Sequence, residues 1–155
     1  MGLLETLTQD HQEVLALLDR VAEGIRALEG GRDLAEAGGS LEEFVSTWDR
    51  AIDNHFRQEE EALFPVLGHV IGTHAGPIAV MLHEHTLLRQ AVGRLREALA
   101  GGGQDLQGLL EPAKTIVDVL TEHIYKEDRV LFPMAEENLS EEQLAEVDLL
   151  AGGQG

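Results

Sequence analysis

The hydrophobic positions of this chain recur at intervals of three, four and seven residues, which is the spacing of amphipathic helices. The first such stretch covers roughly residues 3–29, and Gly30-Gly31 ends it. Three further stretches predict helices over about residues 40–64, 77–100 and 105–136, the last with a kink or restart at Pro112. No sustained alternation of apolar and polar residues occurs, so strands are not predicted.

Residues that favour helix ends support these boundaries. Ser40 with Glu43, and Ser140 with Gln143, have the spacing of a capping box. The second pair predicts a short fifth helix that ends near Leu150. Short connections between long amphipathic helices favour antiparallel neighbours. We therefore predict an all-α fold, an antiparallel up-down-up-down four-helix bundle with a short C-terminal helix, over residues 1–151, and a disordered tail at 152–155.

Composition narrows the classes of function. The 155 residues fit one domain, and the absence of cysteine excludes disulfides, iron–sulfur clusters and thiolate zinc sites. A net charge of −18 argues against nucleic acid and anionic lipid as partners. No secretory signal or membrane-spanning stretch is visible. We expect a cytoplasmic protein that is a monomer or a weak homodimer.

A repeated motif carries the candidate chemistry. The segment HFRQEEEALFP at residues 55–65 matches HIYKEDRVLFP at residues 123–133. Both copies place a histidine and a glutamate four residues apart, which puts the two side chains on one helix face. Each copy follows a helix that carries an acid-histidine pair, Asp10-His11 or Glu84-His85. The chain therefore resembles two copies of one helical hairpin.

These repeats predict a metal site with six protein ligands. The candidate ligands are His11, His55, Glu59, His85, His123 and Glu127. Four imidazoles and two carboxylates suit iron or manganese, although zinc and copper also bind imidazole. Because each carboxylate can bridge two ions, the set can hold a pair of metal ions in a bundle interior. Taken singly, each motif could equally be a surface helix pair, which leaves a metal-free helical interaction protein as an alternative.

Other residues near the repeated motif have less specific predicted roles. Asp10 and Glu84 are either solvated or accept a hydrogen bond from a ligand histidine. The Leu-Phe-Pro segments are expected to serve core packing and a helix end, and Trp48 and Tyr125 to pack in the core. Three histidines fall outside the ligand set and are expected at the surface or in caps, although the loop of His74 could fold inward. They are His69, His74 and His83.

Together the motifs resemble the hemerythrin-like family, the HHE cation-binding domain. The resemblance covers nearly the whole chain and includes Arg89, four residues after His85. It implies a non-haem centre of two iron ions with an oxo or hydroxo bridge, with manganese and zinc ranked below iron. It also implies four terminal histidine ligands, with Glu59 and Glu127 bridging the irons.

One position departs from the oxygen carriers of that family. They have a further histidine where this chain has Met81. The departure argues against plain reversible oxygen carriage and leaves room for a small ligand. We therefore expect a protein that binds or reacts with oxygen, peroxide or nitric oxide. The sequence does not decide whether it is an enzyme, and the alternative is an iron- or oxygen-responsive sensor or iron-binding module without catalytic turnover.

Overall fold

The computed structural model describes residues 2–74 and 76–152, and over these residues the chain is all-helical. The elements are α-helices interrupted by three π-helical turns, labelled η. In chain order they are α1 (Leu3–Glu29), α2 (Leu34–Ala37), α3 (Gly39–Thr47), η1 (Trp48–Ile52), α4 (Asp53–Gln58), η2 (Glu59–Leu63), α5 (Phe64–Ile71), α6 (Pro77–Ala100), α7 (Leu106–Lys126), η3 (Glu127–Leu131), α8 (Phe132–Asn138) and α9 (Glu141–Gly152). No helix among the described residues is long and apolar enough to cross a membrane.

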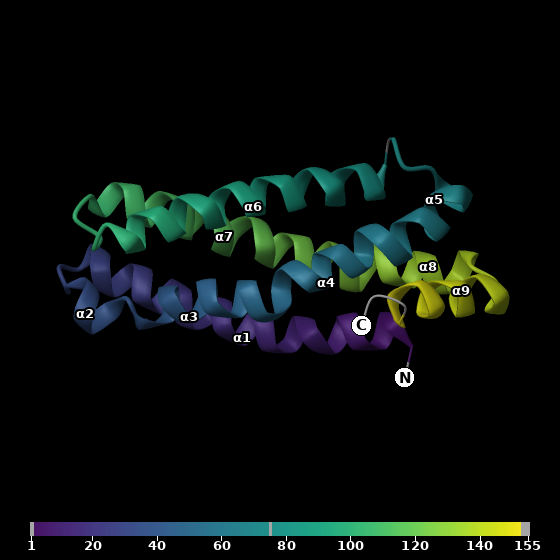
Figure 1. Cartoon of the computed structure of the whole chain (residues 1–155), viewed down its shortest axis with the longest axis horizontal. Coiled ribbons are helices and arrows are strands. Elements are labelled where there is room, and N and C mark those ends of the chain that lie inside the picture. Colours follow the sequence, from purple (N-terminus) through teal and green to yellow (C-terminus); the bar gives the residue numbers. More distant parts are fainter. Residues whose placement is uncertain (1, 75, 153–155) are drawn as a thin grey trace.

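The long elements lie lengthwise beside one another (Figure 1). Helix α7 packs against both α6 and α1, and α3 packs against α1 and α6. Glycines make the reversals between them: Gly31 and Gly102 have φ values of 99° and 78°, which only glycine adopts without strain. Pro77 begins α6, where a missing backbone N–H costs nothing. The predicted ends of the first and third long helices are thus confirmed.

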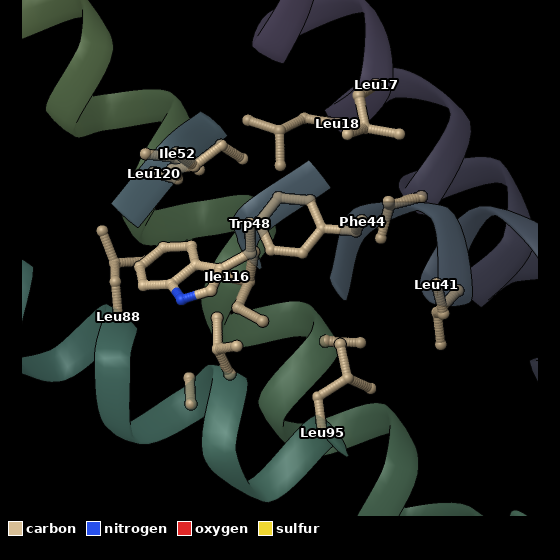
Figure 2. Packing of buried hydrophobic residues seen from close by; sticks show 14 of the residues in the cluster. Leu17, Leu18, Leu41, Phe44, Trp48, Ile52, Leu88, Leu95, Ile116 and Leu120 are labelled. Atoms are coloured by element: carbon tan, nitrogen blue, oxygen red, sulfur yellow. The ribbon is translucent and has the colours of Figure 1, made fainter. Parts of the chain in front are cut away.

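A hydrophobic core fills one half of the molecule. Phe44 and Trp48, both buried, lie among leucine and isoleucine side chains from α1, α6 and α7 (Figure 2). Their rings are 6.4 Å apart. Because this cluster joins all four long segments, it fixes their relative positions at one end of the candidate site.

A second hydrophobic cluster closes the other half. Leu63, Phe64 and Phe132 pack there with Met81 and with the C-terminal helix, through Val147. The start of α1 is held by the same helix, since the Leu3 backbone N–H donates to Asp148 Oδ1 at 2.8 Å. The candidate site therefore lies between two apolar layers.

The structure corrects several local expectations. Helix α3 begins at Gly39, so Ser40 lies inside the first turn and its hydroxyl has no hydrogen-bond partner, whereas the Ser140–Gln143 capping box forms in both directions. Helix α7 continues through Pro112. Tyr125 is 45% exposed rather than buried, with the Arg129 guanidinium 4.9 Å from its ring centre. The predicted tail residues 153–155 lie outside the described residues, and α9 extends to Gly152.

Candidate metal centre

Six buried polar side chains converge between the two hydrophobic clusters. They form two groups whose ligand atoms lie within 4.8 Å of one another. One group is His11, His55, Glu59 and Glu127, and the other is Glu59, His85, His123 and Glu127. The six predicted ligands are thus brought together, and the two glutamates belong to both groups. Glutamate side chains are almost never fully buried in this way without a partner or a metal.

The ring nitrogens of the histidines face the glutamates across short distances. His85 Nε2 lies 3.0 Å from Glu59 Oε1, and His11 Nε2 lies 3.1 Å from Glu127 Oε1. His55 Nε2 is 3.6 Å from Glu59 Oε2, and His123 Nε2 is 3.5 Å from Glu127 Oε1. Both oxygens of each glutamate, and Nε2 of His85 and His123, nevertheless lack a hydrogen bond of acceptable geometry. Buried polar atoms without partners are costly, so these atoms fit a bound cation better than they fit each other.

Two π-helical turns begin at the shared glutamates. The Glu59 carbonyl accepts from the Phe64 N–H, five residues on, and the Glu127 carbonyl accepts from Phe132 in the same way. A proline follows each phenylalanine, and its ring would clash with the carbonyl four residues earlier in a regular α-helix. The wider turn relieves this crowding, and such turns often occur at functional sites. The Leu-Phe-Pro segment therefore shapes the helix at the ligand and does not end it, because α5 and α8 continue beyond it.

Each histidine is oriented by a carboxylate on its other ring nitrogen. His55 Nδ1 lies 3.1 Å from Asp10, and His123 Nδ1 lies 3.0 Å from Glu84. His11 Nδ1 lies 2.7 Å from Asp128, and His85 Nδ1 lies 2.6 Å from Glu60. A carboxylate can only accept, so Nδ1 carries the proton and donates it. Nε2 is then the nitrogen that faces the centre and is free to bind a cation.

Of these four carboxylates, the sequence pointed only to Asp10 and Glu84, and left solvation as their alternative. The geometry of a regular helix turns Glu60 away from the face of Glu59, and the sequence pattern assigns no role to Asp128. Both follow directly after a shared glutamate, at the start of a π-helical turn. Their position after the ligand in both repeats was the signal available in the sequence.

Aromatic rings cover the imidazoles. Phe56 stacks on His85 with ring centres 3.8 Å apart and an interplanar angle of 8°. Phe132 stacks on His11 at 5.6 Å and 6°. These contacts fix the ring planes of His85 and His11 and exclude water from one face of each of these two rings.

The buried carboxylates raise the pKa values of neighbouring histidines, and the histidines in turn lower the pKa of Glu127. Burial disfavours the imidazolium form of His123, but the nearby Glu127 and Glu84 carboxylates raise its pKa to about 10. Against the same opposing effect of burial, Glu59 raises the pKa of His55 well above its usual value, and Glu59 and Glu60 raise that of His85. Burial also opposes ionisation of Glu127, yet contacts with Glu59 and the histidines hold its pKa well below the usual value. Without metal, the fold thus favours a charged Glu127 carboxylate beside protonated His55, His85 and His123 imidazoles.

A cavity of about 170 Å³ reaches the centre from one side. Its floor includes His11, His55 and His123, and Val14 and Leu120 form part of its apolar wall. Such a volume exceeds the roughly 10–15 Å³ that one water needs on the same measure. A small molecule therefore has room next to the ligand nitrogens.

The remaining histidines lie elsewhere. His69, His74 and His83 are all exposed, as expected, and none of them belongs to the cluster. Met81, one turn before His85, is 2% exposed and belongs to the second hydrophobic cluster. The position where oxygen carriers have a further histidine is thus filled by an apolar side chain.

Comparison with known proteins agrees with this geometry. The chain is 37% identical over 86 residues to the iron-sulfur cluster repair protein DnrN of Neisseria gonorrhoeae, which covers 50% of this chain and 54% of that protein. It is 29% identical over 132 residues to the iron-sulfur cluster repair protein YtfE of Pectobacterium carotovorum, covering 81% of this chain and 59% of that protein. The matched region spans less than two thirds of either relative. The family model for the hemerythrin HHE cation binding domain matches residues 2–135. The chain therefore belongs to the hemerythrin family of HHE cation-binding domains.

Proposed function

We propose that this chain is a non-haem di-iron protein that binds or reacts with a small ligand: oxygen, peroxide or nitric oxide. The observation that carries the proposal is the pair of buried four-residue groups that share Glu59 and Glu127. A mixed set of imidazoles and carboxylates favours iron over magnesium or calcium, which prefer oxygen ligands alone. Manganese and zinc rank below iron.

In this proposal each side chain has a defined task. His11 and His55 would hold one ion, His85 and His123 would hold the other, and Glu59 and Glu127, which belong to both groups, would bridge the two ions. Bound iron supplies redox chemistry and exchangeable coordination positions. The outer carboxylates keep Nδ1 protonated so that Nε2 faces the metal. An up-down-up-down four-helix bundle in the cytoplasm, as a monomer or weak homodimer, is the setting that we infer for this site.

The cavity gives a small ligand room beside the cluster. Its volume of about 170 Å³ admits a molecule of the size of oxygen, peroxide or nitric oxide, and its lining combines apolar and charged side chains. Arg20 and Glu43, which are joined by a 2.9 Å ion pair, are part of its lining.

The test is anaerobic loading with Fe(II) followed by rapid mixing with oxygen, hydrogen peroxide or nitric oxide. The proposal predicts a ligand-dependent change in the near-ultraviolet and visible spectrum with at least one of the three. Repeated turnover of peroxide would assign an enzyme, and a stable adduct would assign a binding protein. His85→Ala should abolish the response, whereas His83→Ala, an exposed position on the same helix, should retain it. The proposal would be refuted if the spectrum of the iron-loaded protein stayed the same after mixing with each of the three ligands.

A sensor or iron-binding role is the second candidate, and one contact favours it. Helix α9 packs directly on η2, the turn that begins with Glu59. Metal binding couples to folding, so loading would stabilise this contact and change the surface that α9 presents. Hydrogen exchange of α9 with and without iron tests this role. Equal hydrogen exchange of α9 in the iron-loaded and the metal-free protein would rule out the sensor role.

The names of the relatives add a possible physiological setting. Both are named as iron-sulfur cluster repair proteins. Our proposal is compatible with a part in such repair, in which a di-iron site handles iron or nitric oxide. Restoration of activity to a damaged iron–sulfur enzyme by the iron-loaded chain would test this setting, with the metal-free chain as control.

A further inference from the structure

The four outer carboxylates differ in their cationic partners. Glu60 receives two hydrogen bonds from the Arg89 guanidinium, from Nη1 at 2.8 Å and from Nη2 at 3.1 Å. Glu84 binds the Lys126 ammonium at 2.6 Å. Within the described part of the chain, Asp10 and Asp128 have no lysine or arginine nitrogen within 4.0 Å. The first pair is neutralised by direct contact, and the second is not.

This difference divides the cluster into two unequal halves. Glu60 and Glu84 orient His85 and His123, while Asp128 and Asp10 orient His11 and His55. The repeat in the sequence gives each half two histidines and two outer carboxylates, which are aspartates beside His11 and His55 and glutamates beside His85 and His123. Among the described residues, direct cation contacts to these carboxylates occur only at His85 and His123.

The physical consequence follows from how the outer carboxylate acts. A carboxylate that accepts from Nδ1–H makes the imidazole a stronger donor to the metal at Nε2. A cation bound to the same carboxylate withdraws part of that negative charge. Its own positive charge also repels a metal cation, and this repulsion is little screened near a buried site.

We propose that Arg89 and Lys126 make the two metal positions unequal, so that the position at His11 and His55 fills first and the position at His85 and His123 binds its ion more weakly. The inference rests on the proposed two-metal site and adds an order of loading to it. Arg89 and Lys126 act through the carboxylates and do not themselves contact the metal.

The chain offers matched variants. Lys126→Gln removes the positive charge that contacts Glu84, at a partly exposed position, and keeps an amide hydrogen-bond donor. Arg89→Gln likewise removes the positive charge that contacts Glu60, although Arg89 also contacts Asp53. Arg96→Gln is the control, because Arg96 lies on the same helix as Arg89 and forms a two-pronged ion pair with Asp49, away from the cluster.

The experiment is a titration of the metal-free protein with Co(II), followed by visible absorption and by NMR of labelled histidines. One equivalent should perturb His11 and His55 before His85 and His123. Both Lys126→Gln and Arg89→Gln should tighten the second binding step, by about 10-fold on the scale of outer-carboxylate mutations. Arg96→Gln should leave both steps unchanged.

Equal affinity at the two positions, loading at His85 and His123 first, or an unchanged second step in Lys126→Gln would overturn the inference while leaving a two-metal site intact. Failure to bind a second ion under any condition would overturn the proposed site as well. The two failures are therefore distinguishable in one titration.

Discussion

Loading the centre with metal should release protons, and the structure sets how many. Without metal, the pKa of His123 is raised to about 10, and the pKa values of His55 and His85 are also raised above 6.5. A group is more than half protonated at any pH below its pKa. At pH 6.5 His123 is therefore almost fully protonated and the other two rings are each more than half protonated, so the three imidazoles hold between about 2 and 3 protons that a metal must displace.

The displaced proton is the one on Nε2. Nδ1 of each ring keeps its proton because it donates to an outer carboxylate. Binding of Fe(II) without oxygen should thus release about 2 to 3 protons from these three rings per fully loaded chain, before any bound water ionises. The apparent affinity should rise with pH from 6.5 upward until the imidazoles are neutral without metal.

Calorimetric titration with Fe(II) in two non-chelating buffers of different ionisation enthalpy measures the number of protons released. His83→Ala is the matched control and should release the same number. His123→Ala should release fewer, because it lacks the ring with the pKa of about 10. Release of less than one proton by the wild-type chain at pH 6.5 would refute the reasoning.

Three further predictions concern stability. In thermal unfolding, the metal-free protein should be most stable between about pH 4.5 and 6.5. The stabilisation that comes from the raised pKa of His123 is fully present below pH 6.5 and is lost as the pH rises toward about 10. The stabilisation that comes from the lowered pKa of Glu60 is present above pH 4.5 and is lost as the pH falls toward about 2. A midpoint that rises between pH 7 and 9 without metal would contradict this. Phe44→Ala, at a fully buried ring in the first core, should cost about 3–5 kcal/mol in urea unfolding; a loss below about 1 kcal/mol would show that the ring is not packed as described. Ser140→Ala should cost about 1 kcal/mol because it removes the cap on Gln143 N–H, and Ser46→Ala on an exposed helix face is its control.

The six residues of the cluster could be predicted from the sequence because helix geometry is local. A histidine and a glutamate four residues apart share a face in any α-helix, so His55 with Glu59 and His123 with Glu127 needed no tertiary information. The doubled motif then supplied the partner histidines. Their convergence in the folded chain follows from the pairing of two similar hairpins.

The outer carboxylates could not be read in full, because they depend on the π-helical turns. A regular helix turns by about 100° per residue, which places Glu60 away from the face of Glu59. The wider turn that begins at Glu59, together with the approach of α6, brings Glu60 to His85. Neither a π-helical turn nor the packing of another helix is encoded in the spacing of apolar residues.

The two serine motifs show the same limit at a helix end. Ser140 and Gln143 form the predicted capping box because an extended residue, Leu139, precedes them and leaves the N-terminus free. Ser40 cannot, since α2 leads into α3 through Gly38 and the helix begins before the serine. The same pattern of residues thus caps a helix only where the preceding chain allows it.

The most direct test of the account is the number of metal ions that the reconstituted protein holds. Elemental analysis after anaerobic loading with Fe(II) and removal of free metal should give about two ions per wild-type chain, one for each four-residue group. The double variant Glu59→Ala, Glu127→Ala should fail to hold both ions, because these two residues belong to both groups. One ion or none in the wild-type chain, or two ions in the double variant, would contradict the shared-glutamate centre.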